Sequence, residues 1–388
     1  MKLLHILPDD KFWISAMSIF DRVDVENEYC CILNNNSREA NFVDSDRVSI
    51  IQQKNAYLLW SKSDVDMFVF HSMPRVYYGF ILSIPQNKYV TAISWGYDIY
   101  YPQGDCPPLI HINLYKSKTS ALLKHINGDV SFLIHFKRMI KRLIRFRRTQ
   151  QQRRVQEFLL KEHLKEQQNA LNRIDFLATV LPTEFETLKT LHSIKAKYFP
   201  FLYASRSKEI IVPTIEPKNA KRVLVGNSAD PSNNHIDIFA ELNKRGITNE
   251  LYVPLAYGDL KYSAEIATFL KLHSFIFHIQ DSFLPISEYK AELQNCCAAV
   301  FGHMRQQAMG SIILCMLEGA KVFLYKESIA YSFLKSIGAV VFSIEDDLSI
   351  SAVNDPLSEE ENLINRNALN LFSCENVVSD LNLFFKEH

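Results

Sequence analysis

The sequence predicts an α/β protein built from two Rossmann-like, doubly wound domains in tandem that face a central cleft. Three observations predict this fold. Short apolar runs alternate with segments of helical length, the alternation restarts after a polar stretch with prolines at residues 205–219, and 388 residues exceed what one hydrophobic core usually organises. Short buried strands separated by helices are typical of parallel sheets with crossover helices. In such sheets, ligands bind at the carboxyl ends of the strands.

The first domain is expected to cover residues 1–205. The chain opens with a predicted strand at Lys2–Leu7, because the apolar run stops at Pro8 and is too short for a signal peptide. Apolar runs predict further strands at 28–33, 67–71, 88–94 and 175–180. Helices are predicted at 77–84, over most of a charged insertion at 117–172, and from Pro182 onward.

The second domain is expected to cover residues 206–388, where the alternation is more regular. Strands are predicted at 222–226, 250–254, 275–279, 298–302 and 321–325. Helices are predicted between them, at 234–245, 259–272, 286–295 and 307–319. We expect the last helix of the chain to pack back on the first domain.

The composition restricts the class of protein. A chain that is 47% apolar and 22% charged folds into a globule, and its 43 basic and 43 acidic residues argue against a surface generally covered by polyanions. Seven cysteines without a C-x-x-C pair favour reduced thiols in the cytoplasm over a disulfide framework or a zinc ribbon. No apolar stretch reaches about 18 residues, so a membrane role is expected to be peripheral.

One segment concentrates positive charge. Nine basic residues lie between Lys137 and Arg154, and no acidic residue occurs between Asp129 and Glu157. Apolar residues from Phe136 to Ile144 recur at helical spacing, so the segment predicts a basic amphipathic helix that binds an anionic membrane surface. A solvated helix face and a nucleic-acid patch are the alternatives. The expected membrane contacts are Lys137, Arg138, Lys141, Arg142, Arg145, Arg147 and Arg148.

Short polar residues follow the strand at 222–226 and precede a helix. Gly226 allows close backbone approach, while Ser228, Ser232 and Asn233 offer donors and helix caps. Together with the N–H groups of the helix N-terminus, they predict a cradle for a pyrophosphate. An ordinary capped turn between a strand and a helix would have a similar composition.

A second polar loop follows the strand at 298–302. Arg305 is suited to a bidentate contact with a phosphate or a carboxylate, and Gln306 and Gln307 are suited to sugar hydroxyls or a base edge. The alternative is a set of solvated loop residues.

Two residues of the first half are candidate general bases. Asp98 lies among aromatic residues directly after the strand at 88–94, where burial would raise its pKa. His71 ends another strand. The alternative is that Asp98 caps a turn and His71 is structural. The D-x-D motif at Asp64–Asp66 precedes a strand rather than following one, so we interpret it as structural and predict no metal site.

Together these loops resemble glycosyltransferase family 56. The resemblance rests on a GNSxDxSNxH run at 226–235, an RQQxxG run at 305–310, a WGxDxY run at 95–100, a VPLxYG run at 253–258, and the strand-ending His71. The elements extend from about residue 65 to residue 335. A family typified by a transferase of enterobacterial common antigen synthesis implies a GT-B fold, and transfer with inversion at the sugar carbon and without a metal or cofactor.

The resemblance also implies partners and roles. The donor would be a TDP-linked deoxy-aminosugar, and the acceptor would be a polyprenyl-diphosphate-linked glycan at the cytoplasmic face of the bacterial inner membrane. The second domain would bind the donor, and Asp98 or His71 would deprotonate the acceptor. The implied donor contacts are Gly226, Asn227, Ser228, Ser232, Asn233, Tyr257, Arg305, Gln306, Gln307 and Gly310.

Two other functions stay open from the sequence. One is a non-catalytic protein with a degenerate GT-B fold that binds membranes or polyanions through residues 137–154. The other is a hydrolase or epimerase that acts on the sugar nucleotide alone and has no need of the basic helix.

Overall fold

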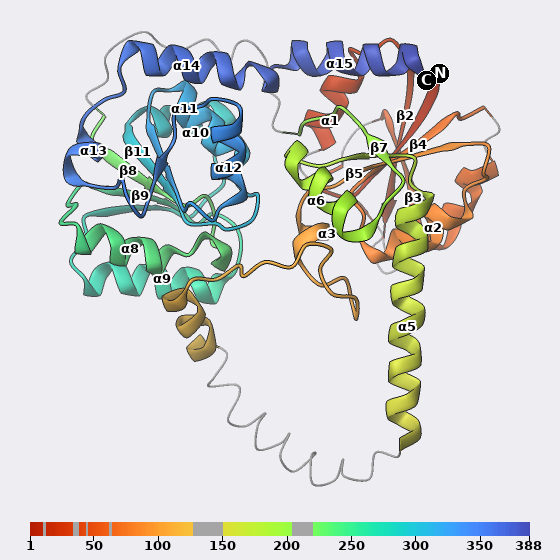
Figure 1. Cartoon of the computed structure of the whole chain (residues 1–388), viewed down its shortest axis with the longest axis horizontal. Coiled ribbons are helices and arrows are strands. Elements are labelled where there is room, and N and C mark those ends of the chain that lie inside the picture. The colour runs from red at the N-terminus through yellow and green to blue at the C-terminus, as the bar shows by residue number, and fades with distance from the viewer. Residues whose placement is uncertain (11–12, 34–38, 44–45, 62–63, 127–149, 204–219) are drawn as a thin grey trace. The chain divides into compact units, whose positions relative to one another are not determined.

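The computed structural model describes residues 1–388 apart from 11–12, 34–38, 44–45, 62–63, 127–149 and 204–219 (Figure 1). The chain divides into two compact units. Unit 1 is Met1–His111, Thr149–Ser205 and Leu371–His388, and unit 2 is Ile112–Arg148 and Arg206–Asn370. The basic residues expected to contact a membrane, Lys137 to Arg148, lie outside the described residues. In the described part of the chain, no helix combines the length and apolarity needed to cross a bilayer.

Unit 1 contains a parallel seven-stranded sheet in the order β3-β2-β1-β4-β5-β6-β7. Its strands are β1 (Lys2–Leu7), β2 (Glu26–Leu33), β3 (Val48–Gln52), β4 (Met67–His71), β5 (Tyr89–Ile93), β6 (Phe176–Ala178) and β7 (Lys197–Tyr198). The central strand β4 is buried along its whole length, as expected where helices cover both faces. The strand order reverses between β1 and β4, so the loops that leave these two strands diverge at the carboxyl edge.

Helices cover both faces of this sheet. Figure 1 shows α1 (Trp13–Phe20) beside α15 (Cys374–Glu387) on one face and α2 (Tyr78–Ser83) beside α5 (Gln150–Arg173) on the other. The remaining helical elements of unit 1 are η1 (Gln53–Ser61), η2 (Arg75–Tyr77), α3 (Tyr97–Tyr100) and α6 (Pro182–His192).

The last helix, α15, belongs to unit 1 because its aromatic residues fill the core there. The ring of Phe384 meets those of Phe176 and Phe199 edge-on, at centroid distances of 4.8 and 5.0 Å. At the amino end of α15, Glu375 forms an ion pair with Arg22, which follows α1.

Unit 2 contains a parallel six-stranded sheet in the order β10-β9-β8-β11-β12-β13. Its strands are β8 (Arg222–Val225), β9 (Leu251–Pro254), β10 (Phe277–Gln280), β11 (Cys296–Phe301), β12 (Lys321–Leu324) and β13 (Phe342–Ser343). Here the order reverses between β8 and β11. Both units therefore have the doubly wound topology that the alternating pattern predicts.

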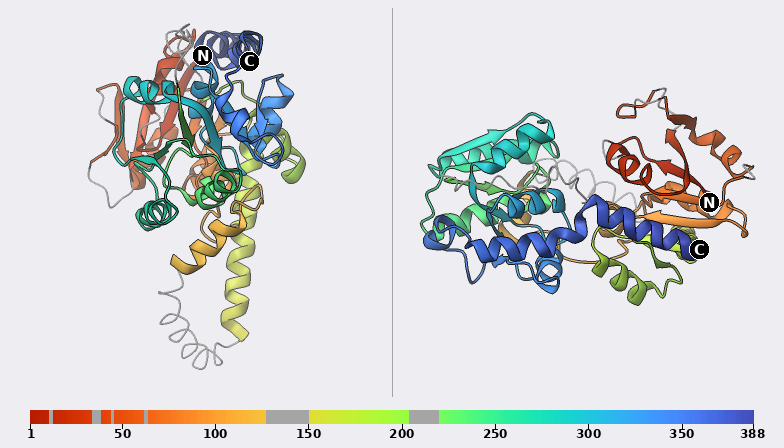
Figure 2. Two further views of the ribbon diagram at one scale, coloured as in Figure 1. Left: turned by 90° about the vertical axis from the view of Figure 1, so that its left-hand side faces the viewer. Right: turned by 90° about the horizontal axis from the view of Figure 1, so that it is seen from above.

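The helices of unit 2 also form two layers. Figures 1 and 2 show α8 (His235–Lys244) and α9 (Leu260–Leu272) on one face of the sheet, with α10 (Ile286–Gln294) and α11 (Met309–Leu317) on the other. The remaining helical elements are η3 (Pro231–Asn233), α12 (Ile329–Ser336), α13 (Ile350–Asn354), α14 (Glu359–Leu369) and η4 (Asn370–Phe372).

The segment at 112–126 also belongs to unit 2, and it is helical from residue 117 onward. Asn234 Oδ1 accepts a hydrogen bond from Lys116 N at 2.8 Å, and the two carboxylate oxygens of Asp237 accept from Lys118 N and Thr119 N at 2.9 and 2.8 Å. A carboxylate from α8 therefore caps this helix. This contact explains why the observed division differs from a single boundary at 205/206.

Candidate functional site

The polar loops of unit 2 lie together at the point where its strand order reverses. One loop, 226–234, leaves β8 and the other, 302–308, leaves β11, and β8 and β11 are neighbours in the sheet. The helices that follow the two strands lie on opposite faces of the sheet, and in doubly wound sheets this is the point where ligands bind. The implied donor residues therefore converge, with Tyr257 contributed by the loop after the adjacent strand β9.

Two glycines permit the close approach of these loops. Gly226 has φ +69°, and a Cβ atom there would lie 2.5 Å from His235 Nε2. Gly258 has φ +122°, and a Cβ atom there would lie 2.5 Å from the carbonyl carbon of Ala229. Only glycine suits such backbone conformations at these contacts. The loops after β8 and β9 are therefore joined, with Ala229 N donating to Tyr257 O at 2.7 Å.

A row of side-chain hydrogen bonds links the loops that follow the three strands. Asn227 Nδ2 donates to the Tyr257 hydroxyl at 3.1 Å, and Asn227 Oδ1 accepts from Gln307 Nε2 at 3.3 Å. The Ser232 hydroxyl lies 2.5 Å from Gln307 Oε1 and 2.6 Å from Asp230 Oδ1, and it donates to one of them at a time. The row fixes the amide groups of Asn227 and Gln307 relative to each other.

Two of the implied donor residues are interior supports of the 226–234 loop. Asn233 is fully buried, accepts from Asn227 N at 3.2 Å, and donates through Nδ2 to the carbonyl oxygens of Ser228 and Asp230, both at 3.1 Å. Ser228 is almost fully buried beside it. In this conformation Ser228 and Asn233 shape the loop, and direct contact with a ligand stays a prediction.

The loop after β11 places a cation beside a helix N-terminus. Arg305 is buried, and its Nη1 donates to Gln306 O at 2.8 Å, so the guanidinium is held on its own loop. Gln306 Oε1 is buried without a hydrogen-bond partner among the described residues. Helix α11 follows Ala308, which has φ +57°, and its first turn, which contains Gly310, has no side-chain cap. Uncapped amides and a guanidinium suit a phosphate.

Two histidines of these segments were given no role by the sequence analysis, although His235 ends the GNSxDxSNxH run. His235 and His303 are fully buried, and neither ring has a hydrogen-bond partner among the described residues. Burial lowers the pKa of each to about 3, so both are neutral at pH 7. The sequence contains no signal that these two histidines are buried without a hydrogen-bond partner among the described residues, because burial depends on which segments pack around them.

In unit 1, Asp98 joins two loops at the carboxyl edge of the sheet. Its Oδ2 accepts from Met73 N at 2.8 Å, and its Oδ1 accepts from the Ser94 hydroxyl, Trp95 N and Gly96 N at 2.7, 3.1 and 3.0 Å. The carboxyl is fully buried, and burial raises its pKa. This side chain therefore joins the loops that follow β4 and β5.

The other candidate base, His71, is also fully buried and is part of a hydrogen-bonded chain. Its Nε2 lies 2.9 Å from His5 Nδ1, and its Nδ1 lies 2.5 Å from the Tyr203 hydroxyl. The next residue, Ser72, has φ +122°, a strained conformation for a residue with a side chain. Tyr203 could not be identified from the sequence, because it follows a two-residue strand and is far from His71 along the chain.

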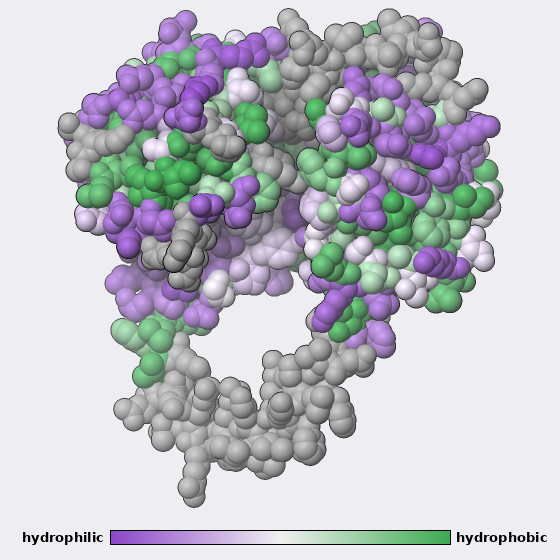
Figure 3. Space-filling view, turned by 180° about the vertical axis from the view of Figure 1, so that it is seen from behind, coloured by the Kyte–Doolittle hydropathy of each residue, from purple (hydrophilic) through white to green (hydrophobic). Residues whose placement is uncertain are grey.

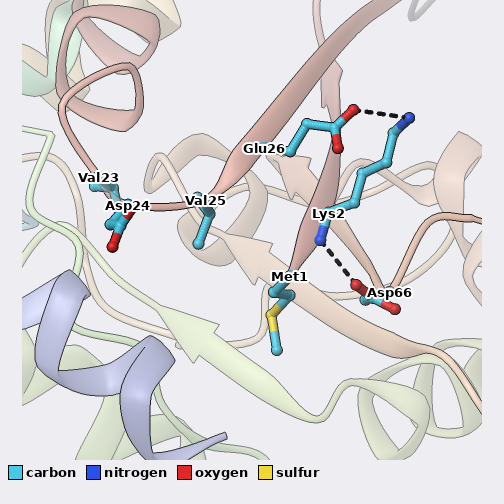
Figure 4. Close-up of a pocket in the computed structure, with 7 residues that line it drawn as sticks. All are labelled: Met1, Lys2, Val23, Asp24, Val25, Glu26 and Asp66. Carbon is cyan, nitrogen blue, oxygen red and sulfur yellow. Dashed lines mark hydrogen bonds and ion pairs between the residues drawn. The ribbon is translucent and has the colours of Figure 1, made fainter.

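A hollow of about 600 Å³ lies at the opposite edge of the unit 1 sheet (Figure 4). It is lined by the amino ends of β1, β2 and β4, including Lys2, Glu26 and Asp66. Lys2 forms an ion pair with Asp64, and its backbone N–H donates to Asp66 at 2.8 Å. The D-x-D motif therefore neutralises a lysine at the amino edge, away from the loops of the candidate site.

Comparison with known proteins identifies the family. The model described as 4-alpha-L-fucosyltransferase, glycosyl transferase group 56, matches residues 141–381, more than half of the chain. No curated protein matches the sequence.

Solved structures share the fold. The E. coli trehalose-6-phosphate structure bound with UDP-2-fluoro glucose has a TM-score of 0.61 at 10% identity, with 100% of this chain and 98% of that chain covered. Anabaena HepE in complex with UDP and glucose has a TM-score of 0.61 at 9% identity, and the lipopolysaccharide outer core galactosyltransferase WaaB has 0.57 at 11%, with both chains fully covered in each case. With two Rossmann-like units and GT-B neighbours, this chain has the GT-B fold. It belongs to glycosyltransferase group 56 and is a glycosyltransferase.

Proposed function

We propose that this enzyme transfers a deoxy-aminosugar, 4-acetamido-4,6-dideoxygalactose or a related sugar, from TDP to a polyprenyl-diphosphate-linked glycan. Transfer would proceed with inversion and without a metal, in the synthesis of a surface polysaccharide such as O-antigen, capsule or common antigen. The observation that carries the donor half is the convergence of an uncapped helix N-terminus, Arg305 and a linked row of amides at the strand-order reversal of unit 2. The sugar and the acceptor rest on the family resemblance.

The unit 2 loops suit the leaving nucleoside diphosphate. The first-turn amides of α11 and the turn at Gly226 would hold its phosphates, and the Arg305 guanidinium would neutralise the charge that develops as the sugar leaves. Asn227, Gln307 and Tyr257 present amide and hydroxyl groups for sugar or ribose hydroxyls. The UDP complex of the structurally similar HepE supports a sugar nucleotide as the ligand class.

Between the two candidate bases, the geometry favours His71. Asp98 already accepts four hydrogen bonds, one from the loop after β4 and three from the loop after β5. Its oxygens are therefore occupied in holding these two loops. His71 ends at the same edge with one ring nitrogen directed at a single, partly exposed residue, Tyr203. We therefore assign Asp98 a positioning role and His71 the role of proton acceptor.

A membrane-bound acceptor is supported by an exposed apolar patch on α5. Val155, Phe158, Leu159, Leu160 and Leu164 are all exposed, by 37 to 61%. Figure 3 shows hydrophobic side chains gathered on the part of α5 that follows the undescribed residues. The sequence immediately before this patch carries the nine basic residues from Lys137 to Arg154, and each is worth about 1 kcal/mol near an anionic bilayer. The combination favours peripheral binding to the cytoplasmic face of the inner membrane.

The donor half is tested by thermal unfolding with millimolar TDP, UDP, GDP, ADP and CMP, with and without EDTA. A ligand at a hundredfold excess over its Kd stabilises the folded state by about 2.7 kcal/mol. We expect a shift that is selective for TDP and unchanged by EDTA. Arg305→Lys should weaken TDP binding about tenfold or more, because a lysine cannot make the bidentate contact.

Arg222→Lys is the matched control. Arg222 lies at the amino end of β8, the opposite edge of the same sheet, where it forms ion pairs with Glu250 and Glu292. That variant should bind TDP as the wild type does. A shift with UDP or GDP in place of TDP would discard the TDP assignment, and no shift with any nucleotide would contradict the whole proposal. Transfer from a TDP-sugar to a polyprenyl-diphosphate glycan then tests the acceptor.

A further inference from the structure

A continuous chain of hydrogen bonds crosses the unit 1 sheet where its strand order reverses. Asn27 Oδ1 on β2 lies 2.9 Å from His5 Nε2 on β1, and His5 Nδ1 lies 2.9 Å from His71 Nε2 on β4. His71 Nδ1 lies 2.5 Å from the hydroxyl of Tyr203. Four residues from four separate stretches of sequence thus form one line that ends at a phenol.

The protons of this line are fixed from its Asn27 end. Asn27 Nδ2 donates to the carbonyl oxygens of Phe20 and Val25, at 2.9 and 3.3 Å, so Oδ1 is the acceptor that faces His5. His5 Nε2 must therefore carry a hydrogen, and in a neutral ring its Nδ1 must accept. His71 Nε2 then donates, which leaves the lone pair of His71 Nδ1 to accept from the Tyr203 hydroxyl.

The surroundings keep both imidazoles neutral. Both rings are fully buried against aromatic residues, with Phe20 at 4.4 Å from His5 and 5.8 Å from His71 between ring centroids. Burial lowers the pKa of His5 to about 4 and that of His71 well below its ordinary value, while it raises the pKa of Tyr203. The line at rest is uncharged.

Several ionisable groups among the described residues influence the line. Asp21 acts on His5, and Tyr29 stacks on the His5 ring at 4.8 Å. At the other end, Asp98, Asp10 and Tyr97 act on Tyr203. Each carboxylate favours positive charge on the line, which helps an imidazole that takes up a proton.

Tyr203 is the outer end of the line. His71 is fully buried, whereas Tyr203 is partly exposed. The Tyr203 ring stands edge-on to those of Trp95 and Phe201, at centroid distances of 5.1 and 4.9 Å. Trp95 belongs to the loop whose amides Asp98 holds. Among the described contacts, the phenol is the group of a partly exposed residue that meets His71 Nδ1 directly.

We propose that Tyr203 is a catalytic residue that passes the proton of the acceptor hydroxyl to His71. This inference rests on the proposed function. As the acceptor oxygen forms its bond to the sugar carbon and the bond from that carbon to the diphosphate oxygen breaks, the acceptor proton moves to the Tyr203 oxygen. The phenol proton moves at the same time to His71 Nδ1. The proton thus ends on His71, and the nucleoside diphosphate leaves as an anion. The imidazolium of His71 then donates through Nε2 to His5 Nδ1.

The first test compares Tyr203→Phe with Tyr198→Phe. Tyr198 ends β7, five residues away, and is also partly buried, but it lies outside the line. Tyr203→Phe should lower kcat by a factor of about 10² to 10⁴, the usual contribution of positioned proton transfer, with the KM for the donor unchanged. Tyr198→Phe should keep the wild-type kcat. A wild-type kcat for Tyr203→Phe would overturn the proposal.

The second test asks whether the line acts as a unit. In Asn27→Asp a carboxylate replaces the amide oxygen that faces His5 and stabilises positive charge on both rings. The fall of kcat on the acid side of its pH profile should therefore move to higher pH by about one unit, because the base is protonated more easily. Loss of activity with an unmoved limb would show that the line is only structural. If this variant does not fold, the ¹⁵N shift of His71 Nδ1 in wild type and Tyr203→Phe decides, since the proposal requires an unprotonated nitrogen that loses its donor in the variant.

The two proposals fail in different ways. An inactive wild type with every TDP-sugar and polyprenyl acceptor would contradict the proposed function. An active wild type whose Tyr203→Phe variant is equally active would contradict only the proton path.

Discussion

At the scale of single residues, the unpaired histidines His235 and His303 make the stability of unit 2 depend on pH. Both are neutral in the folded protein because burial lowers their pKa values to about 3. In the unfolded chain a histidine takes up a proton near pH 6.5. The unfolded state therefore binds more protons between pH 6.5 and 3, so stability falls as the pH falls through this window.

His303→Leu should remove one such proton site. A leucine fills a similar volume and leaves no unpaired nitrogen, so at pH 7 the free energy of unfolding should stay within about 1 kcal/mol of wild type. At pH 5 the variant should be more stable than wild type by about 2 kcal/mol, the cost of keeping one ring neutral there. Urea unfolding at both pH values checks this, with the exposed His111→Gln as control. Parallel losses in wild type and variant would contradict it.

Gly258 is a residue at which a single added methyl group should destabilise the protein. At φ +122° a Cβ atom would meet the backbone of Ala229, whereas at Gly338, with φ +79°, it would meet nothing within 4 Å. Gly338→Ala should cost about 1 kcal/mol from the backbone conformation alone. Gly258→Ala should cost at least about 2 kcal/mol and weaken nucleotide binding, measured by urea unfolding and titration calorimetry. Equal costs would show that the two loops are not in close contact.

At the scale of elements, the helix at 117–126 depends on a cap supplied from α8. Asp237→Ala removes both hydrogen bonds to Lys118 N and Thr119 N, and the loss of a cap costs about 1–2 kcal/mol. We expect faster amide exchange over 112–126 and none over the strands of unit 1, measured by hydrogen exchange. Asp237→Asn keeps one acceptor oxygen and should lie between wild type and Asp237→Ala. Unchanged exchange in Asp237→Ala would argue against the cap.

The sequence predicts some of these elements and not others. Strands such as β4 and β11 were predicted because burial on both faces makes them unbroken apolar runs. β3 and β13 were not predicted, because the first is a partly exposed edge strand and the second has two residues. The segment at 112–126 was expected in the first domain, since its anchors, Asn234 and Asp237, lie more than a hundred residues away and leave no local pattern.

The candidate site was likewise predictable from the sequence only in part. Loops after β5, β8 and β11 were predicted because polar residues follow apolar strands there, and the structure brings the unit 2 loops together. The line of hydrogen bonds that runs from Asn27 through His5 and His71 to Tyr203 could not be predicted, because it depends on which strands are neighbours in the sheet. The role of Asp98 as a clamp on two loops likewise depends on Met73, which its own loop does not reveal.

At the scale of the whole molecule, the exposed patch on α5 should govern attachment to membranes. Phe158→Ser should lower binding to anionic vesicles about tenfold or more, because it removes a large apolar side chain from the interface. Ile14 on α1 is equally exposed, at 61%, so Ile14→Ser is the matched control and should bind normally. Co-sedimentation with phosphatidylglycerol vesicles measures this, and high salt should weaken binding for wild type. Equal binding by both variants would exclude α5 from the contact.

The placement of α15 in unit 1 has a consequence for how the polypeptide is made. A ribosome releases Leu371–His388 after all of the other segments of both units, and Phe384 completes the aromatic cluster around Phe176 and Phe199. Unit 2 is therefore able to fold while unit 1, most of which precedes unit 2 along the chain, still has an uncovered apolar face. This reverses the usual order in which amino-terminal domains fold first during translation. Nascent chains stalled before residue 371 should need a chaperone on that face, and release of the last helix should free them from it.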